Sequence, residues 1–154
     1  MKDAVKYSTG KGILFALIGM LVGVAIWLTI MVLAEDGTGI KDVTAGFLAA
    51  LLGILVAGTY QKGAGKPRIV GIILVVFLTF IAAATTFTTG MYAVFWGWSV
   101  FDSFIMLRMI PILGLRGSLL SVFVQEFIIA TGVSVAMAIV TLIIGSVVRN
   151  NRRN

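Results

Sequence analysis

The chain has no cysteine and no histidine among its 154 residues. Without cysteine it can form no disulfide bond and offers no thiolate as a nucleophile or metal ligand. Without histidine it lacks the commonest metal ligand and the side chain most often used as a general acid or base. We therefore expect no cofactor, no metal site and no catalytic residue, and we favour a protein that is not an enzyme.

Charge is also scarce. Only 12% of the residues are charged, 60% are hydrophobic, and the mean hydropathy is +1.11. In a soluble domain about a quarter of the residues are charged. Because this chain has half that share, it lacks the polar surface that a soluble fold needs, and we expect a single membrane domain over residues 1–154.

Four apolar runs are long enough to cross a bilayer as helices, which takes about 17–25 residues. They cover residues 12–34, 44–60, 69–90 and 119–148. Backbone amides and carbonyls cannot stay unpaired in hydrocarbon, so each run should be an α-helix. The sequence predicts an all-α integral membrane protein, built as a four-transmembrane-helix bundle.

The net charge of +6 is distributed in a way that indicates membrane orientation and not nucleic-acid binding. Nine of the twelve cations lie before the first run, between the second and third, and after the fourth: Lys2, Lys6, Lys11, Lys62, Lys66, Arg68, Arg149, Arg152 and Arg153. The loop between the first two runs, EDGTGIKD, is acidic. Because cationic loops stay in the cytoplasm, we expect both termini there, membrane lipids as partners, and no nucleic acid.

Residues 96–117, WGWSVFDSFIMLRMIPILGLRG, are apolar enough to cross but carry Asp102, Arg108 and Arg116. A charge at mid-membrane costs about 2.5–3.5 kcal/mol on the insertion scale. A crossing here would also move the last cationic stretch outside and remove the charge bias. We therefore expect this segment to stay at the outer face.

A short helix is expected within that segment, over about residues 100–109. Ser99 and Asp102 have the spacing of a capping box, and Pro111 cannot continue a helix. The helix should lie at the extracytoplasmic interface. Aromatic side chains favour membrane interfaces. Tyr92, Trp96 and Trp98 are expected to anchor this helix, and Tyr60 is expected to be an interface anchor at the end of the second run.

Several short motifs follow one another along the chain. Gly19, Gly23 and Trp27 form G-x3-G-x3-W, the second run leads into GTYQKGAGK, and GWSVFDSF follows the third run. In this combination the chain resembles a group of small, uncharacterised bacterial four-span membrane proteins, although that group more usually has GGK where this chain has GAGK. The resemblance implies the cytoplasmic membrane of a bacterium. It implies no activity and no catalytic residue.

Small residues repeat at helical spacing in the first two runs. Gly19 and Gly23 form a GxxxG motif, and Gly46 and Gly53 lie in a similar series with Ala50 and Ala57. Small residues allow two helix backbones to approach closely in lipid. Two interpretations stay open: a seam between two copies of the chain, or packing of the first two helices within one chain, which we favour.

The polar residues with the strongest claim to a function are Asp102, Arg108, Arg116, Gln125 and Glu126. An ionisable group inside a span indicates a proton relay or a cation site. However, residues 127–148 are 22 residues, enough to cross alone. Glu126 and Gln125 could then lie at the outer boundary, with Glu126 paired to Arg116, and we favour this interpretation.

Two further stretches are considered as sites. Thr85, Thr86, Thr88 and Thr89 could line a small hydrophilic vestibule, but threonine in a membrane helix more often bonds the carbonyl four residues earlier. Residues 58–67, GTYQKGAGKP, are similar to a phosphate-binding loop but lack its first glycine and its final hydroxyl. We expect a flexible cytoplasmic turn there.

Three functional classes remain. The favoured one is a non-enzymatic membrane subunit, either an oligomer or an accessory to a larger membrane protein. The second is a small-solute or ion channel or carrier whose pathway passes near Glu126. The third is a membrane enzyme acting on lipid or peptide, with Asp102 and Glu126 as the acid–base pair, and it is the weakest because so few catalytic side chains are present.

Overall fold

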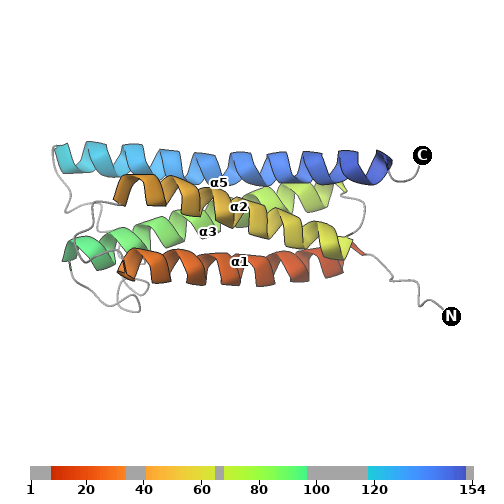
Figure 1. The fold of residues 1–154 in the computed structure, drawn as a ribbon, viewed down its shortest axis with the longest axis horizontal. Helices are drawn as coiled ribbons and strands as arrows, with labels where there is room; N and C mark the ends of the chain where they lie inside the picture. The colour runs from red at the N-terminus through yellow and green to blue at the C-terminus, as the bar shows by residue number, and fades with distance from the viewer. Residues whose placement is uncertain (1–7, 34–40, 65–67, 97–117, 152–154) are drawn as a thin grey trace.

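The computed structural model describes residues 8–33, 41–64, 68–96 and 118–151, and these residues form four α-helices. The helices are α1 (Thr9–Leu33), α2 (Lys41–Ala64), α3 (Ile69–Trp96) and α5 (Ser118–Asn151), labelled as in Figure 1. Each contains a span long and apolar enough to cross a membrane, namely Thr9–Met31, Gly46–Ala64, Ile69–Gly90 and Val124–Arg149. The prediction of an all-helical chain with four such helices is confirmed, whereas the short helix expected over 100–109 lies outside the described residues.

The helices extend beyond the apolar runs that predicted them. α1 begins after Ser8, whose Oγ accepts a hydrogen bond from the Lys11 amide at 3.1 Å, as an N-cap residue does. α2 continues through Gln61 and Lys62 to Ala64, so the flexible turn expected over 58–67 is wrong for its first seven residues. Hydropathy marks where lipid contact ends, but the backbone hydrogen-bond ladder continues past that point.

The four helices pack around a common core with α2 and α3 on one diagonal. α2 packs mainly against α1 and α5, α3 also packs against α1 and α5, the contact between α2 and α3 is smaller, and α1 and α5 touch each other least. α1 begins and α5 ends at the same end of the bundle (Figure 1), which we call the terminal end. The opposite end is called the far end. α2 therefore runs antiparallel to α1 and parallel to α5.

The parallel direction of α2 and α5 bears on the segment between α3 and α5. Trp96, the last residue of α3, and Ser118, the first residue of α5, both lie at the far end (Figure 1). The chain thus leaves and re-enters the bundle at the same end. This is the arrangement that a non-crossing segment requires; residues 97–117 themselves lie outside the described residues.

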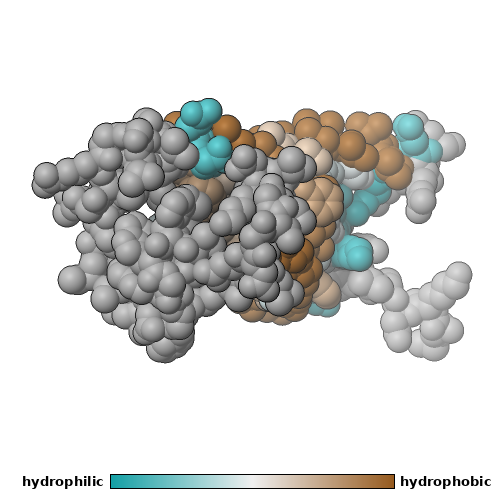
Figure 2. Space-filling model, turned by 60° about the vertical axis from the view of Figure 1, so that its left-hand side comes forward, coloured by the Kyte–Doolittle hydropathy of each residue, from teal (hydrophilic) through white to brown (hydrophobic). Residues whose placement is uncertain are grey.

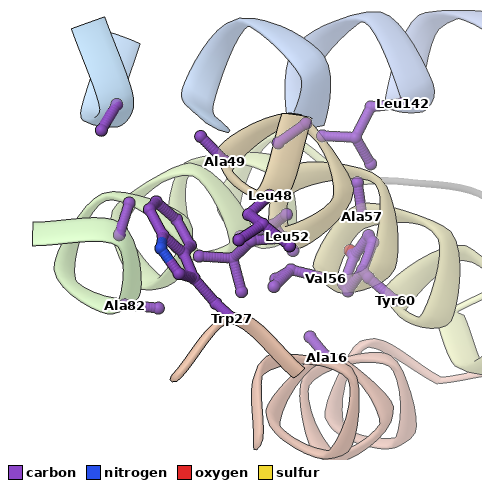
Figure 3. Close-up of a cluster of buried hydrophobic side chains, with 14 of the residues drawn as sticks. Ala16, Trp27, Leu48, Ala49, Leu52, Val56, Ala57, Tyr60, Ala82 and Leu142 are labelled. Carbon is purple, nitrogen blue, oxygen red and sulfur yellow. The ribbon is translucent and has the colours of Figure 1, made fainter. Parts of the chain in front are cut away.

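The core is centred on α2. Half of the residues in its span are buried, against a third or less in each of the other three spans. Leu48, Leu52 and Val56 of α2 gather beside Trp27 of α1 (Figure 3), and all four side chains are almost fully buried. The Trp27 indole nitrogen donates a hydrogen bond to Met31 Sδ at 3.0 Å, which satisfies its only polar group.

The exterior of the bundle is apolar on all four helices. Leu21, Phe47, Ile73 and Ile128 are each more than 60% exposed. In Figure 2 the described surface between the two ends is mostly hydrophobic, and hydrophilic residues gather near the ends. In lipid such a surface carries no penalty, because the surrounding acyl chains are as apolar as the side chains.

Candidate functional site

The GxxxG motif of α1 faces α2 of the same chain. A Cβ atom built on Gly19 would lie 2.7 Å from the Leu55 carbonyl oxygen, and one on Gly23 would lie 2.6 Å from Leu52 Cδ1. At Gly19 the contact is with backbone and allows only glycine unless the helices move apart, whereas at Gly23 the Leu52 side chain would have to shift. Of the two interpretations of this motif, the contacts match packing within one chain, and they leave Gly19 and Gly23 covered by α2.

A second close approach joins α2 to α5. A Cβ atom on Gly53 would collide with the Ser134 carbonyl oxygen and lie 3.0 Å from the Ala138 amide nitrogen. At the same level the Ser134 hydroxyl donates a hydrogen bond to the Ala49 carbonyl oxygen at 2.8 Å. Gly46 differs, because a Cβ atom there would meet nothing within 4 Å. Thus Gly53 holds the two parallel helices close together and Gly46 does not.

A polar contact joins α2 and α5 at the terminal end. The Gln61 side-chain amide donates to the carbonyl oxygens of Thr141 and Leu142, both at 3.0 Å. In return Arg149 Nη2 donates to the Gln61 carbonyl oxygen at 3.2 Å. Gly145 makes room, since a Cβ atom there would overlap the Gln61 side chain. We call this set the Gln61–Arg149 clasp.

Sequence reasoning missed the clasp. The sequence pattern predicts a flexible turn at Gln61 and gives Arg149 a role in membrane orientation only. The clasp carries no chemistry of its own, because an amide and a guanidinium held by carbonyls are neither nucleophile nor acid–base pair. A polar amide next to an apolar run, with glycine on another helix to receive it, is the signal that could have indicated a contact between helices.

The four threonines near the far end of α3 behave as two pairs. Thr85 and Thr88 donate to the carbonyls four residues earlier, at 2.8 and 2.7 Å, as threonine commonly does in membrane helices. Thr86 and Thr89 are buried, and their hydroxyls have no hydrogen-bond partner within the described residues. Near the far end, this second pair leaves hydrogen-bonding capacity unused, as the buried Tyr60 hydroxyl does at the terminal end.

Gln125 and Glu126 lie about two turns into α5, which begins at Ser118. Gln125 is exposed and Glu126 is half-buried. The next residue, Phe127, packs edge-on against Phe87 of α3 with 6.1 Å between ring centroids, so Glu126 lies at the level of the threonine pairs. Its predicted partner Arg116 lies outside the described residues, as do Asp102, Arg108 and Trp98.

Tyr60 occupies a different place from the one expected of an interface anchor. Its side chain is fully buried, and its hydroxyl lies where a Cβ atom on Gly71 would otherwise be. The missing side chain at Gly71 lets the start of α3 close over the ring, so Tyr60 fills the core at the terminal end. Tyr92 and Trp96 belong to the last turns of α3, and their side chains lie outside the description.

Within the described ranges, no three acidic side chains come together in a way that could hold a metal ion. The described features that could serve a function are therefore the small-residue contacts, the Gln61–Arg149 clasp and the buried hydroxyls. Comparison of the chain with protein-family models, with curated proteins and with solved structures finds no match.

Proposed function

We propose that the protein is a non-enzymatic subunit of the bacterial cytoplasmic membrane that acts by helix packing, in an oligomer or against a larger membrane protein. In this proposal the terminal end of the bundle faces the cytoplasm. The partner contacts the apolar outside of the bundle, and no bond is made or broken.

The observation that carries the proposal is the outward position of Gly58. Phe47, Leu51, Ile54 and Gly58 follow one another at spacings of four, three and four residues, which places them on one stripe of α2. Phe47 and Ile54 are exposed, so this stripe faces outward. A Cβ atom on Gly58 would meet nothing within 4 Å, so nothing described within the chain requires glycine there.

Glycine inside a helix is less stable than alanine by about 1 kcal/mol. At Gly53 this cost is offset by the close approach of α5, but at Gly58 the described part of the chain offers no such gain. In lipid, a small residue on a helix surface allows another helix to approach closely. A helix of a partner lying on the α2 stripe would account for glycine at this position.

The distribution of cations supports the proposed orientation. Lys11, Lys62, Arg68 and Arg149 come from the start of α1, the end of α2, the residue before α3 and the end of α5. All four positions are at the terminal end (Figure 1). Cationic residues next to membrane helices are retained in the cytoplasm, so this charge supports a cytoplasmic terminal end.

The test is purification from native membranes in mild detergent, followed by native mass spectrometry. We expect the wild-type chain to co-purify with a second copy or another membrane protein at fixed stoichiometry, and Gly58→Ile to lose it. Ala136→Ile is the matched control, because it adds the same side chain at an exposed position of α5. A wild-type protein found only as a single chain, or equal partner loss in both variants, would contradict the proposal.

A small-solute pathway remains the second candidate, and the observation that favours it is the pair of unpartnered hydroxyls at Thr86 and Thr89. These hydroxyls are buried in the core, whereas the α2 stripe lies on the outside of the bundle. The α2 stripe is therefore not involved in this second candidate function. An enzymatic role has no comparable support within the described residues.

A further inference from the structure

Apart from Tyr60 of α2, the buried residues of the described core that carry a hydroxyl come from two helices. They are Thr79, Thr86 and Thr89 of α3 and Thr131 and Ser134 of α5. Thr86 and Thr89 lie in the far-end half of α3 and Thr79 near its middle, whereas Thr131 and Ser134 lie between the far end and the middle of α5. Towards the terminal end the same two helices bury Val75 and Leu142 instead. The buried hydroxyl at the terminal end is that of Tyr60 on α2.

Three of these five hydroxyls are satisfied inside the bundle. Thr79 donates to the Val75 carbonyl at 2.8 Å and Thr131 to the Phe127 carbonyl at 2.7 Å. Ser134 donates across to α2. Outside the core, the hydroxyls of Thr59 and Thr141 also bond the carbonyl four residues earlier. Bonding to the helix's own backbone is thus the usual state of a threonine in this bundle.

Thr86 and Thr89 depart from that state. They are 2% and 1% exposed, and neither hydroxyl has a hydrogen-bond partner within the described residues. For Thr86 there is a local reason, because the Ala82 carbonyl that it would use already accepts a hydrogen bond from Thr85 at 3.1 Å. A buried hydroxyl without a partner is costly, so these two positions call for a partner that the described chain does not supply.

The geometry restricts what that partner can be. Residues three apart on a helix lie on the same side, one turn from each other, so one small guest can reach both hydroxyls. The neighbours are apolar: a Cβ atom on Gly90 would lie 2.7 Å from Met31 Cε, and Phe87 packs against Phe127. No charged side chain is buried in the described core, and Glu126 at the same level is half-buried, so an anion would be uncompensated and a neutral guest needs no counter-charge.

We propose that Thr86 and Thr89 form a binding site for water, which enters the bundle from the far end. A buried water needs two to four polar partners, and the two hydroxyls provide two of them. Both threonines lie in the half of α3 (Ile69–Trp96) that is nearer the far end, so the far end is the nearer entrance. The hydrated part of the core ends near the middle of α3, where Thr79 is satisfied by its own helix.

The first test removes the hydroxyls without changing side-chain shape. In Thr86→Val and Thr89→Val, each single variant should melt lower than wild type by about 3 °C, since the water and the remaining hydroxyl lose a partner. The double variant should melt higher than the sum of the two shifts predicts, because both hydroxyls serve the same water. Thr79→Val is the matched control on the same stripe. Single variants that both melt higher than wild type would overturn the proposal. Such a result would show that neither hydroxyl has a water molecule as its hydrogen-bond partner.

The second test measures hydration directly and uses the absence of native cysteine. A thiol reacts as its thiolate, which forms only where water reaches it. Thr86→Cys and Thr89→Cys in liposomes should react with methyl methanethiosulfonate at least roughly tenfold faster than Ile81→Cys, a lipid-exposed position of the same helix. Equal rates at all three positions would overturn the proposal. Both tests use the isolated chain, so their outcome is independent of whether a membrane partner exists.

Discussion

Gly53 and Gly58 belong to the same helix, yet they have opposite surroundings. At Gly53 the backbone of α5 lies where a side chain would be, and at Gly58 there is open space. Both are glycines in an apolar helix, so residue type alone does not tell which of them faces another helix. The positions of these two glycines around the helix, known only once α5 is placed, decide which of them holds the bundle together.

Gly53→Ala should therefore destabilise the bundle. The added methyl group meets backbone atoms of Ser134 and Ala138, which cannot rotate aside, and overpacking of this kind costs about 1–3 kcal/mol. Gly58→Ala should instead stabilise the isolated chain by up to about 1 kcal/mol, because alanine favours the helix. The midpoint of SDS-induced unfolding in detergent micelles measures both. Equal midpoints for the two variants would show that α5 does not approach α2 at Gly53.

Buried polar residues show the same limit of sequence reasoning. Tyr60 was expected at an interface because aromatic rings favour it, but a glycine on another helix, Gly71, opens a place for its ring in the core. Gln61 was expected in a turn, yet it bonds two carbonyls of α5. In each case the partner that fixes the position of the side chain lies on another helix. The local sequence pattern does not indicate that partner.

At the scale of elements, the four helices could be predicted because lipid leaves an apolar run no other way to satisfy its backbone. The ends of the helices could not be predicted, since α2 remains helical through the polar residues up to Ala64. The choice of neighbours could not be predicted either. α2 is joined to α3 by a short connection, but it packs more extensively against α1 and α5, because the small residues that permit close approach face those helices.

The parallel packing of α2 and α5 can be tested by disulfide crosslinking. Ser134 Oγ lies 2.8 Å from the Ala49 carbonyl oxygen, so Ala49→Cys combined with Ser134→Cys should form an intramolecular disulfide on mild oxidation. Ala49→Cys combined with Leu142→Cys is the control, because Leu142 is two turns further along α5. The chain has no other cysteine, and a mobility shift without reductant reports the bond. Crosslinking of the control pair alone would show that α5 runs the opposite way or is shifted by two turns.

At the scale of the whole molecule, the direction of α5 decides how the chain is threaded. α1 begins and α5 ends at the terminal end, and Trp96 and Ser118 share the far end (Figure 1). If the four helices cross a membrane, this arrangement gives four crossings and places the end of α5 on the same side as the start of α1. The cations Lys11, Lys62, Arg68 and Arg149 then lie on that side together, which we propose to be the cytoplasm.

The side of the membrane that the terminal end faces is measured most directly with paired topology reporters. Green fluorescent protein fused after Asn154 should fluoresce, and alkaline phosphatase fused there should be inactive, because the phosphatase works only outside the cytoplasm. Phosphatase inserted in the acidic loop at Gly37, between α1 and α2, should be active. Active phosphatase after Asn154 would mean an odd number of crossings or an inverted bundle, and either result contradicts a four-span protein with both ends in the cytoplasm.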